Sequence, residues 1–137
     1  MTLKELLNTK DRFAAVNGVQ LIEVKEGYAK TQMTVTPDHL NAGGVCQGGA
    51  LFTLGDLAFA ALMNSRGKLT FGIGNSVSFL HSAKVGDVLT AEATEVFNHH
   101  KIPYCEVKVT NQDGGLICTM TGTAYRKDVE MPYNGLM

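Results

Sequence analysis

The sequence has few cysteines, no block of like charges and no uninterrupted apolar run long enough to cross a membrane. Three cysteines occur among 137 residues, and none forms a C-x-x-C or other metal-type pair. This usage is typical of a reduced, intracellular protein and excludes a disulfide scaffold. The formal net charge is −1, which argues against nucleic acid or an anionic membrane surface as the partner.

The N-terminal sequence MTLKELLNTKDRF carries charges throughout and lacks the apolar run of a signal peptide. The longest apolar stretch, 48–63, contains Asp56 and is shorter than the roughly 18 apolar residues that a membrane helix needs. From these two observations we expect a cytoplasmic protein, and the length predicts one domain with its own core. We expect this domain to span 1–137, with an N-terminal helical segment at 1–17 and a C-terminal tail at 128–137.

Turn residues divide the chain into short strand-type runs around one helix-type run. Thr2-x-x-Glu5 is a capping pattern that predicts a short first helix, and 48–63 predicts a long helix that stops before Gly67. Strands are predicted at 19–25, 28–36, 70–81, 88–97, 102–111 and 116–126. Strands joined by tight turns pair antiparallel, and a helix that is apolar on most sides needs a sheet curled around it. The pattern therefore predicts an α+β fold, with an antiparallel β-sheet wrapped around one long central helix.

Asp56 is an ionisable residue in the middle of that apolar helix. Burying an unpaired carboxylate costs several kcal/mol, so Asp56 has either a structural partner or a function. Helical periodicity places small or polar residues on the same face, and these are Gly49, Thr53, Ala60 and Asn64. Such a face predicts a cleft. Gly55 costs about 1 kcal/mol in helix propensity relative to Ala, which indicates a close approach by another group.

The predicted beginning of the helix, Gln47-Gly48-Gly49, is a second chemical feature. Free N–H groups at a helix N-terminus bind an anion or a polarised carbonyl oxygen, and glycine lets a substrate come close. Together with a carboxylate base they form the minimal set for attack on an acyl group. The alternatives are that the glycines only form a tight turn and that Asp56 is only a structural acid.

The spacing of these two features sets a condition. Gly48 and Asp56 are eight residues apart, which is roughly 12 Å along a helix. An Asp side chain reaches only a few Å, so one chain cannot bring both groups to the same carbonyl. If both act on one bond, the carboxylate comes from a second copy, and the protein is a homodimer with its active sites at the interface.

The segment LNAGGVCQGGALFTLGDLAFAALMNSRG, supported by VSFLHSAKVGDVLTAEATEV, resembles the hotdog-fold acyl-CoA thioesterases, and most closely the PaaI-like phenylacetic-acid-degradation subgroup. The resemblance implies a hotdog fold, hydrolysis of a thioester to a carboxylic acid and free coenzyme A, and homodimers that pair again into tetramers. It implies no cofactor other than the coenzyme A of the substrate. The rival interpretation is a non-catalytic acyl-CoA-binding or sensing protein. A hydratase of the same fold is a weaker one, because no His lies between 40 and 80.

The resemblance also implies residue roles. Asp56 would activate water or, less favourably, attack as a nucleophile. The Gly48 amide would hold the thioester oxygen, and Asn41 would position the water or the substrate, although an Asx-type loop bond is an equal alternative. Gln47 stands where the family usually has His; it can donate a hydrogen bond but cannot change its charge near neutral pH.

Further substrate contacts are expected from residues beside these positions or from cationic turns. The candidates are Gln47, Gly49, Thr53, Ser76, Lys84 and His99. Ser76 stands for a Ser or Thr that some relatives use on the strand after the helix, with Thr70 as an alternative. The His99–Lys101 turn can contact the phosphates of coenzyme A or can simply be solvated. No metal site is predicted, because no His has ligand-type spacing, and a Cys46 thiolate nucleophile has no nearby His to activate it.

Overall fold

Six strands form one antiparallel sheet in the computed structural model, which describes all 137 residues. The strands are β1 (Gln20–Lys25), β2 (Tyr28–Thr34), β3 (Lys68–Phe79), β4 (Val88–Phe97), β5 (Tyr104–Thr110) and β6 (Leu116–Glu130). Their order in the sheet is β1-β2-β4-β5-β6-β3, so β1 and β3 are the two edges. All six predicted strands are present.

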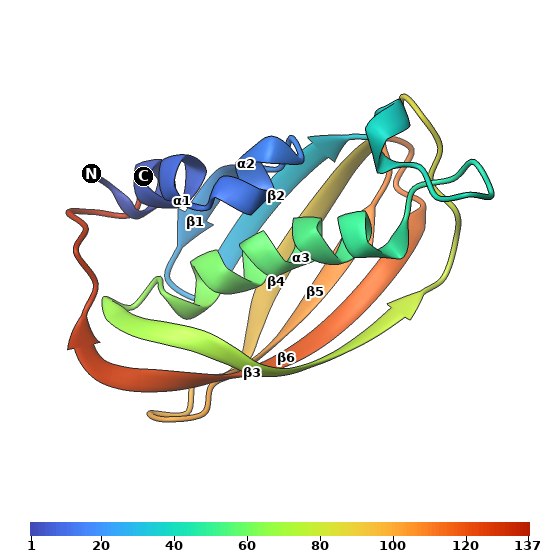
Figure 1. Cartoon of the computed structure of the whole chain (residues 1–137). Helices are drawn as coiled ribbons and strands as arrows, with labels where there is room; N and C mark the ends of the chain where they lie inside the picture. Colours follow the sequence, from blue (N-terminus) through green and yellow to red (C-terminus); the bar gives the residue numbers. More distant parts are fainter.

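The sheet curls around helix α3 (Gly48–Met63), which lies on its concave side (Figure 1). Most of α3 is buried, and the core joins its leucines to alternate residues of the strands. The largest fully buried side chains include Leu54, Leu57 and Leu62 from the helix, and Met33, Leu89, Ile117 and Met120 from the sheet. The predicted α+β architecture, an antiparallel sheet wrapped around one central helix, is confirmed.

Glycines let the helix approach the sheet closely. A Cβ at Gly55 would overlap the sulfur of Met120, which is the close approach that the sequence indicated. The Phe59 ring occupies the space that side chains at Gly72 and Gly122 would fill. Gly72 of the FGIG segment therefore serves packing against α3, whereas Gly74 lies beside Thr123 of the neighbouring strand.

The N-terminal segment forms two helices, α1 (Leu3–Lys10) and α2 (Arg12–Val16), which lie beside α3 and cover the β1 side of the sheet (Figure 1). The Asn8 side chain hydrogen-bonds both backbone groups of Leu21, donating to O at 3.0 Å and accepting from N at 2.8 Å. It thus takes the place of a neighbouring strand at this point of the β1 edge. The C-terminal residues return to α1, where the Leu3 amide donates to the Gly135 carbonyl.

The boundaries of β3 and β6 differ from the prediction. The two strands extend to Lys68 and Glu130, which pair with each other, so β6 reaches three residues into the segment predicted as a tail. The Lys68 ammonium also binds the carboxylates of Asp128 and Glu130. These are long-range contacts, which local turn patterns do not contain.

The other edge strand, β3, has no neighbouring strand on its outer side. Its backbone pairs with β6 alone. Four large apolar side chains along or just after this strand are between 47% and 56% exposed, namely Phe71, Ile73, Phe79 and Leu80. An edge of this kind can pair with another strand.

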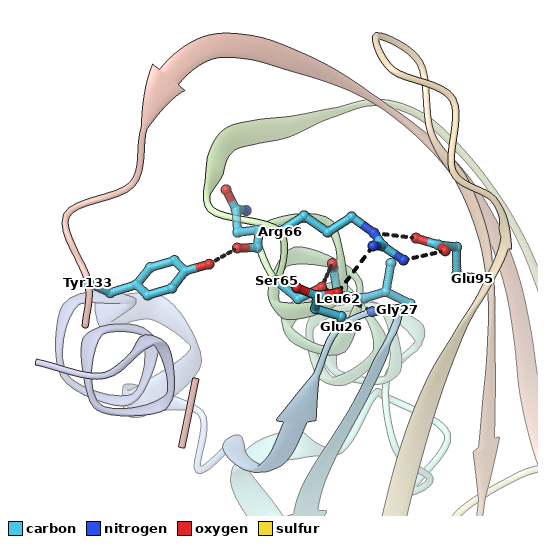
Figure 2. A network of polar contacts seen from close by, with 8 residues as sticks. Glu26, Gly27, Leu62, Ser65, Arg66, Glu95 and Tyr133 are labelled. Carbon is cyan, nitrogen blue, oxygen red and sulfur yellow. Dashed lines mark hydrogen bonds and ion pairs between the residues drawn. The ribbon is translucent and has the colours of Figure 1, made fainter. Parts of the chain in front are cut away.

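A polar network holds the C-terminal end of α3 (Figure 2). Arg66 donates two hydrogen bonds to the Glu95 carboxylate and also pairs with Glu26. Ser65 accepts from the Gly27 amide, and the Tyr133 hydroxyl donates to the Asn64 carbonyl at 2.7 Å.

No helix of the chain has the length and apolar character that crossing a membrane requires.

Candidate active site

The Asp56 face of α3 is the part of the helix that the chain itself leaves partly open. Gly49 is exposed, and Thr53, Asp56 and Ala60 are half-buried, whereas their neighbours in the helix are mostly buried. Asn64 departs from the predicted face. It is buried, and its side chain binds the backbone of Thr70 on β3, which makes it a structural residue.

The Asp56 carboxylate has no partner within the chain, because no hydrogen bond or ion pair includes it. Burial raises the pKa of Asp56 above its usual value, and the Asp11 carboxylate at the start of α2 adds to the shift. Both effects disfavour the charged form. A carboxylate in such surroundings is a stronger base than one in water, which suits it to accept a proton.

The beginning of α3 contains one free donor. The side chain of Gln47 caps the helix, and its Oε1 accepts from the Gly49 amide at 2.6 Å. The amides of Ala50 and Leu51 donate to the Gln47 carbonyl. The Gly48 N–H forms no hydrogen bond, so it alone among the first amides of the helix is available to a ligand.

A cavity of about 330 Å³ adjoins this donor. Its walls come from the loop before α3, from Gly48 and Leu51, and from the end of β3 with the residues that follow; they are Asn41, Val45, Cys46, Gly48, Leu51, Phe79, Leu80, His81 and Ser82. The Phe79 ring lies directly against Gly48, since a Cβ at Gly48 would be 3.0 Å from its Cζ. Gly48, whose amide is free, therefore lines a pocket with both apolar and polar walls.

Lys84 lies in a neighbouring cavity of about 340 Å³, which shares Val45, His81 and Ser82 with the first. Its backbone N–H donates to Asp87 and fixes the turn, and its ammonium forms no ion pair. Lys84 is therefore close to the Gly48 pocket, with its charge free for an anionic group.

A third cavity, of about 270 Å³, lies on the other side of the helix N-terminus, between α3 and α2. It contains Gln47, Gly49 and Thr53 together with Phe13 of α2. The Thr53 hydroxyl donates to the Gly49 carbonyl at 2.8 Å within the helix. Phe13 and Asp11 were not among the predicted site residues, and no sequence signal ties α2 to this face of α3.

The Asn41 side chain forms the Asx-type loop bond that the sequence analysis gave as the alternative to a role in positioning water or substrate. Its Oδ1 accepts from the amides of Gly43 and Val45, at 2.9 and 3.2 Å, and shapes the glycine-rich loop. The residue also lines the cavity beside Gly48. Its amide nitrogen donates no hydrogen bond within the chain, so it can contact a bound molecule.

Ser76 and His99 lie apart from these groups. Asn75, Val77 and Phe79 pair with residues of β6 that face α3, whereas Ser76 pairs with Thr121. Because side chains alternate between the two faces of a strand, Ser76 lies on the convex face of the sheet. His99 follows β4 near the C-terminal end of α3, and its carbonyl accepts from Arg126. One chain therefore does not bring either residue to Gly48.

The alternative chemistries find little support in the geometry. Burial raises the pKa of the Cys46 thiol, which disfavours a thiolate. No group of three or more His, Cys, Asp or Glu side chains is arranged to hold a metal ion.

Comparison with known proteins places the chain and its fold in a family. The family model described as thioesterase superfamily matches residues 43–118, which include α3 and the glycine-rich loop before it. The chain therefore belongs to the thioesterase superfamily, and its fold is the hotdog fold. Within that class its sequence is 33% identical over 116 residues to the acyl-coenzyme A thioesterase PaaI of Escherichia coli K12, covering 85% of this chain and 83% of that protein.

Other relatives agree with this placement. A putative esterase of Archaeoglobus fulgidus is 39% identical over 130 residues, covering 95% of this chain and 84% of the relative. The E. coli PaaI structure superposes with a TM-score of 0.90, at 30% identity and 93% coverage of both chains. A Streptococcus mutans protein bound to acetyl CoA superposes with a TM-score of 0.79, at 25% identity, covering 82% of this chain and 91% of that one.

Proposed function

We propose that the protein hydrolyses acyl-CoA thioesters at active sites that two copies of the chain build together. The observation that carries the proposal is a pair of unsatisfied groups on α3, the Gly48 N–H at its beginning and the Asp56 carboxylate near its middle. One is a donor for a developing oxyanion and the other is a base. The similarity to an acyl-CoA thioesterase and to a protein that binds acetyl CoA supports the choice of substrate.

The spacing of the two groups supports a site between copies. Both lie on one straight helix, roughly 12 Å apart along its axis, so a single thioester cannot contact both in one chain. The open β3 edge, with its exposed Phe71 and Ile73, offers the surface for a second copy. A two-fold pairing there would bring the open face of one α3 alongside the other.

In this mechanism the thioester carbonyl accepts a hydrogen bond from Gly48 N–H. Asp56 of the partner takes a proton from water, and the water oxygen forms a bond to the carbonyl carbon. The negative charge moves to the carbonyl oxygen, where the Gly48 amide and the positive end of the helix dipole stabilise it. The intermediate collapses, the C–S bond breaks, and the proton on Asp56 passes to the coenzyme A sulfur.

Two experiments test the proposal. The first measures the release of free thiol from a panel of aliphatic and aromatic acyl-CoAs by the wild type and by Asp56→Asn. We expect wild-type turnover and a loss of roughly 10²-fold or more in the variant, which is the scale of a positioned base. Tight binding of acyl-CoA with no turnover by the wild type would instead indicate the non-catalytic binding protein.

The second experiment tests the shared site by mixing two inactive variants. Asp56→Asn and Gly48→Pro are unfolded together, refolded as a mixture and assayed. If each site takes Asp56 from one copy and Gly48 from the other, a mixed dimer holds one intact site, and about a quarter of the wild-type activity returns. If both groups of a site came from one chain, mixing would restore nothing.

A further inference from the structure

The cavity beside Gly48 contains a histidine that the chemistry described above does not use. His81 follows the end of β3 and lines this cavity together with Gly48 and Asn41. The neighbouring Gln47, at the beginning of α3, cannot change its charge near neutral pH, whereas an imidazole can. The fold therefore brings to Gly48, from a distant part of the sequence, a side chain that can carry a proton.

Contacts on both sides of His81 hold it beside the beginning of α3. Two residues before it, the Phe79 ring lies against Gly48, where a Cβ would be 3.0 Å from the ring. Two residues after it, the Ala83 carbonyl accepts from the Cys46 amide at 2.8 Å. The segment between these two contacts runs along the residues that lead into α3, and His81 lies in its middle.

The hydrogen bond of the His81 ring fixes its tautomer. Nδ1 lies 2.9 Å from the carbonyl oxygen of Ser82. A carbonyl oxygen only accepts, so Nδ1 carries a hydrogen and donates it, and Nε2 is the nitrogen that gains or loses a proton. Nε2 forms no hydrogen bond within the chain, and the side chain is exposed. His81 can therefore hold a proton on Nε2 and give it to a bound molecule.

Charged groups surround the other side of the ring. A second cavity shares His81 with the first, and its charged side chains are Lys84, Asp87 and Asp113. A hydrogen bond from the Lys84 amide is the main cause that lowers the pKa of Asp87, and the His81 charge adds to the effect. The Asp87 carboxylate and the His81 imidazolium thus attract each other. In the first cavity the remaining titratable group is Cys46, and burial raises the pKa of its thiol.

We propose that His81 is a further catalytic residue, which protonates the sulfur of coenzyme A as it leaves. The inference rests on the proposed function. The thioester carbon carries an oxygen, an acyl chain and a sulfur, and the oxygen is held by Gly48 N–H. When the acyl chain lies along the open face of the partner's α3, next to the partner's Asp56, the sulfur is on the opposite side. There it faces the cavity that His81 lines.

The proton transfer is part of the collapse of the tetrahedral intermediate. The electron pair of the oxyanion re-forms the C=O bond, and the C–S bond breaks. The electron pair of that bond stays on sulfur, which takes the Nε2 proton of the His81 imidazolium and becomes the thiol of coenzyme A. The neutral imidazole then receives the proton that Asp56 took from water, so both residues return to their starting forms. His81 is the carrier through which the proton on Asp56 reaches the sulfur.

The test compares two thioesters that have the same acyl group and differ in the leaving thiol. One is the acyl-CoA, whose alkyl thiolate is basic and needs a proton. The other is the thioester of 4-nitrothiophenol, whose thiolate is weakly basic and leaves without one. The variant is His81→Asn, whose amide can still donate to the Ser82 carbonyl but has no counterpart of Nε2. The matched control is Lys108→Gln, which removes an exposed charge on the convex face of β5.

We expect His81→Asn to lower kcat for the acyl-CoA roughly 10²-fold, the scale of a positioned acid, and to leave kcat for the aryl thioester unchanged. Because His81 must be protonated to act, wild-type kcat/KM for the acyl-CoA should fall as the pH rises through the neutral range. This fall should be absent in His81→Asn and present in the control. Equal losses with the two thioesters, or an unchanged kcat for the acyl-CoA, would overturn the proposal.

A measurement without turnover distinguishes this proposal from the proposed function. The Cε1–H resonance of His81, identified by its loss in His81→Asn, is followed against pH in the Asp56→Asn protein. The protein is saturated with coenzyme A or with desulfo-coenzyme A, in which hydrogen replaces the thiol. An imidazolium that faces the sulfur pairs with the thiolate, so only coenzyme A should move the titration of the resonance to higher pH.

The two results separate the claims. If coenzyme A moves the titration but no thioester is hydrolysed, the proposed function fails and the placement of the sulfur at His81 stands. If coenzyme A and desulfo-coenzyme A act alike, the sulfur does not lie at His81, and the proposal is overturned whether or not the protein hydrolyses thioesters.

Discussion

The side-chain oxygen of Gln47 accepts a hydrogen bond from the Gly49 amide at 2.6 Å, and this bond leaves Gly48 N–H as the only donor of the first turn of α3 without an acceptor. A residue expected to touch the substrate is thus used as the helix cap. The Gln47 cap thereby determines which amide remains available to a ligand.

Replacing Gly48 with Pro should reduce kcat by roughly 10²- to 10³-fold, the cost of removing one oxyanion donor. Proline is well accepted at the first helical position, and Gln47 before it already has an extended backbone, with ψ of 139°. Gly48→Ala is the control, because it retains the N–H and adds only a Cβ against the exposed Phe79 ring. Steady-state thiol release measures both; equal losses in the two variants would refute the role of the amide.

Asp56→Asn should stabilise the fold at neutral pH. The pKa of Asp56 is raised above 3.8 by burial and Asp11, so at intermediate pH the folded state binds more protons than the unfolded state. The contribution of Asp56 to stability is therefore greatest at low pH and falls as the pH rises through the folded-state pKa. In urea unfolding between pH 3 and 8, the free energy of unfolding of the variant should increase relative to that of the wild type as the pH rises. A difference that does not change with pH would contradict the assignment of Asp56 as a buried acid.

Asp11→Asn should move the acidic limb of the pH–rate profile to lower pH. The Asp11 charge raises the pKa of Asp56, so its removal lets the base stay ionised in more acidic solution. Asn is as good a helix cap as Asp, so α2 is retained. The profile of kcat/KM against pH gives the shift, and Asp113→Asn, in the turn between β5 and β6, serves as the control that should leave the profile in place.

Gly55→Ala should destabilise the protein by about 1–2 kcal/mol, because overpacking the core exceeds the gain in helix propensity. The added Cβ overlaps the sulfur of Met120, which is buried. In a double-mutant cycle with Met120→Ala the two losses should be less than additive, since the truncated side chain makes room. Chemical denaturation measures all four proteins, and strict additivity would show that the two residues do not compete for this space.

The elements of the fold could be predicted because local patterns determine them. Turn residues delimit the strands, and the apolar helix demands a curled sheet, so both features are visible without any long-range information. The ends of β3 and β6 could not be predicted in this way. They depend on the pairing of Lys68 with Glu130, which are far apart in the sequence.

The candidate site was predictable to the extent that one helix contains it. Asp56 and Gly48 stand out by their type and spacing within α3. The face on which Ser76 lies depends on register irregularities in β3 near Lys68 and Gly72, and the position of His99 depends on where the β4–β5 loop ends in the curled sheet. Asp11 approaches Asp56 only through the packing of α2 on α3, for which the sequence contains no periodic signal.

The two edges of the sheet differ in how far their backbone hydrogen bonds are satisfied. Asn8 saturates β1 at Leu21, whereas the backbone of β3 pairs on one side only. A sheet with one free edge can accept a further strand on that side only. Were Asn8 unable to make its two bonds, both edges would be open, and strand pairing could then continue at each end of the sheet, as it does in fibres.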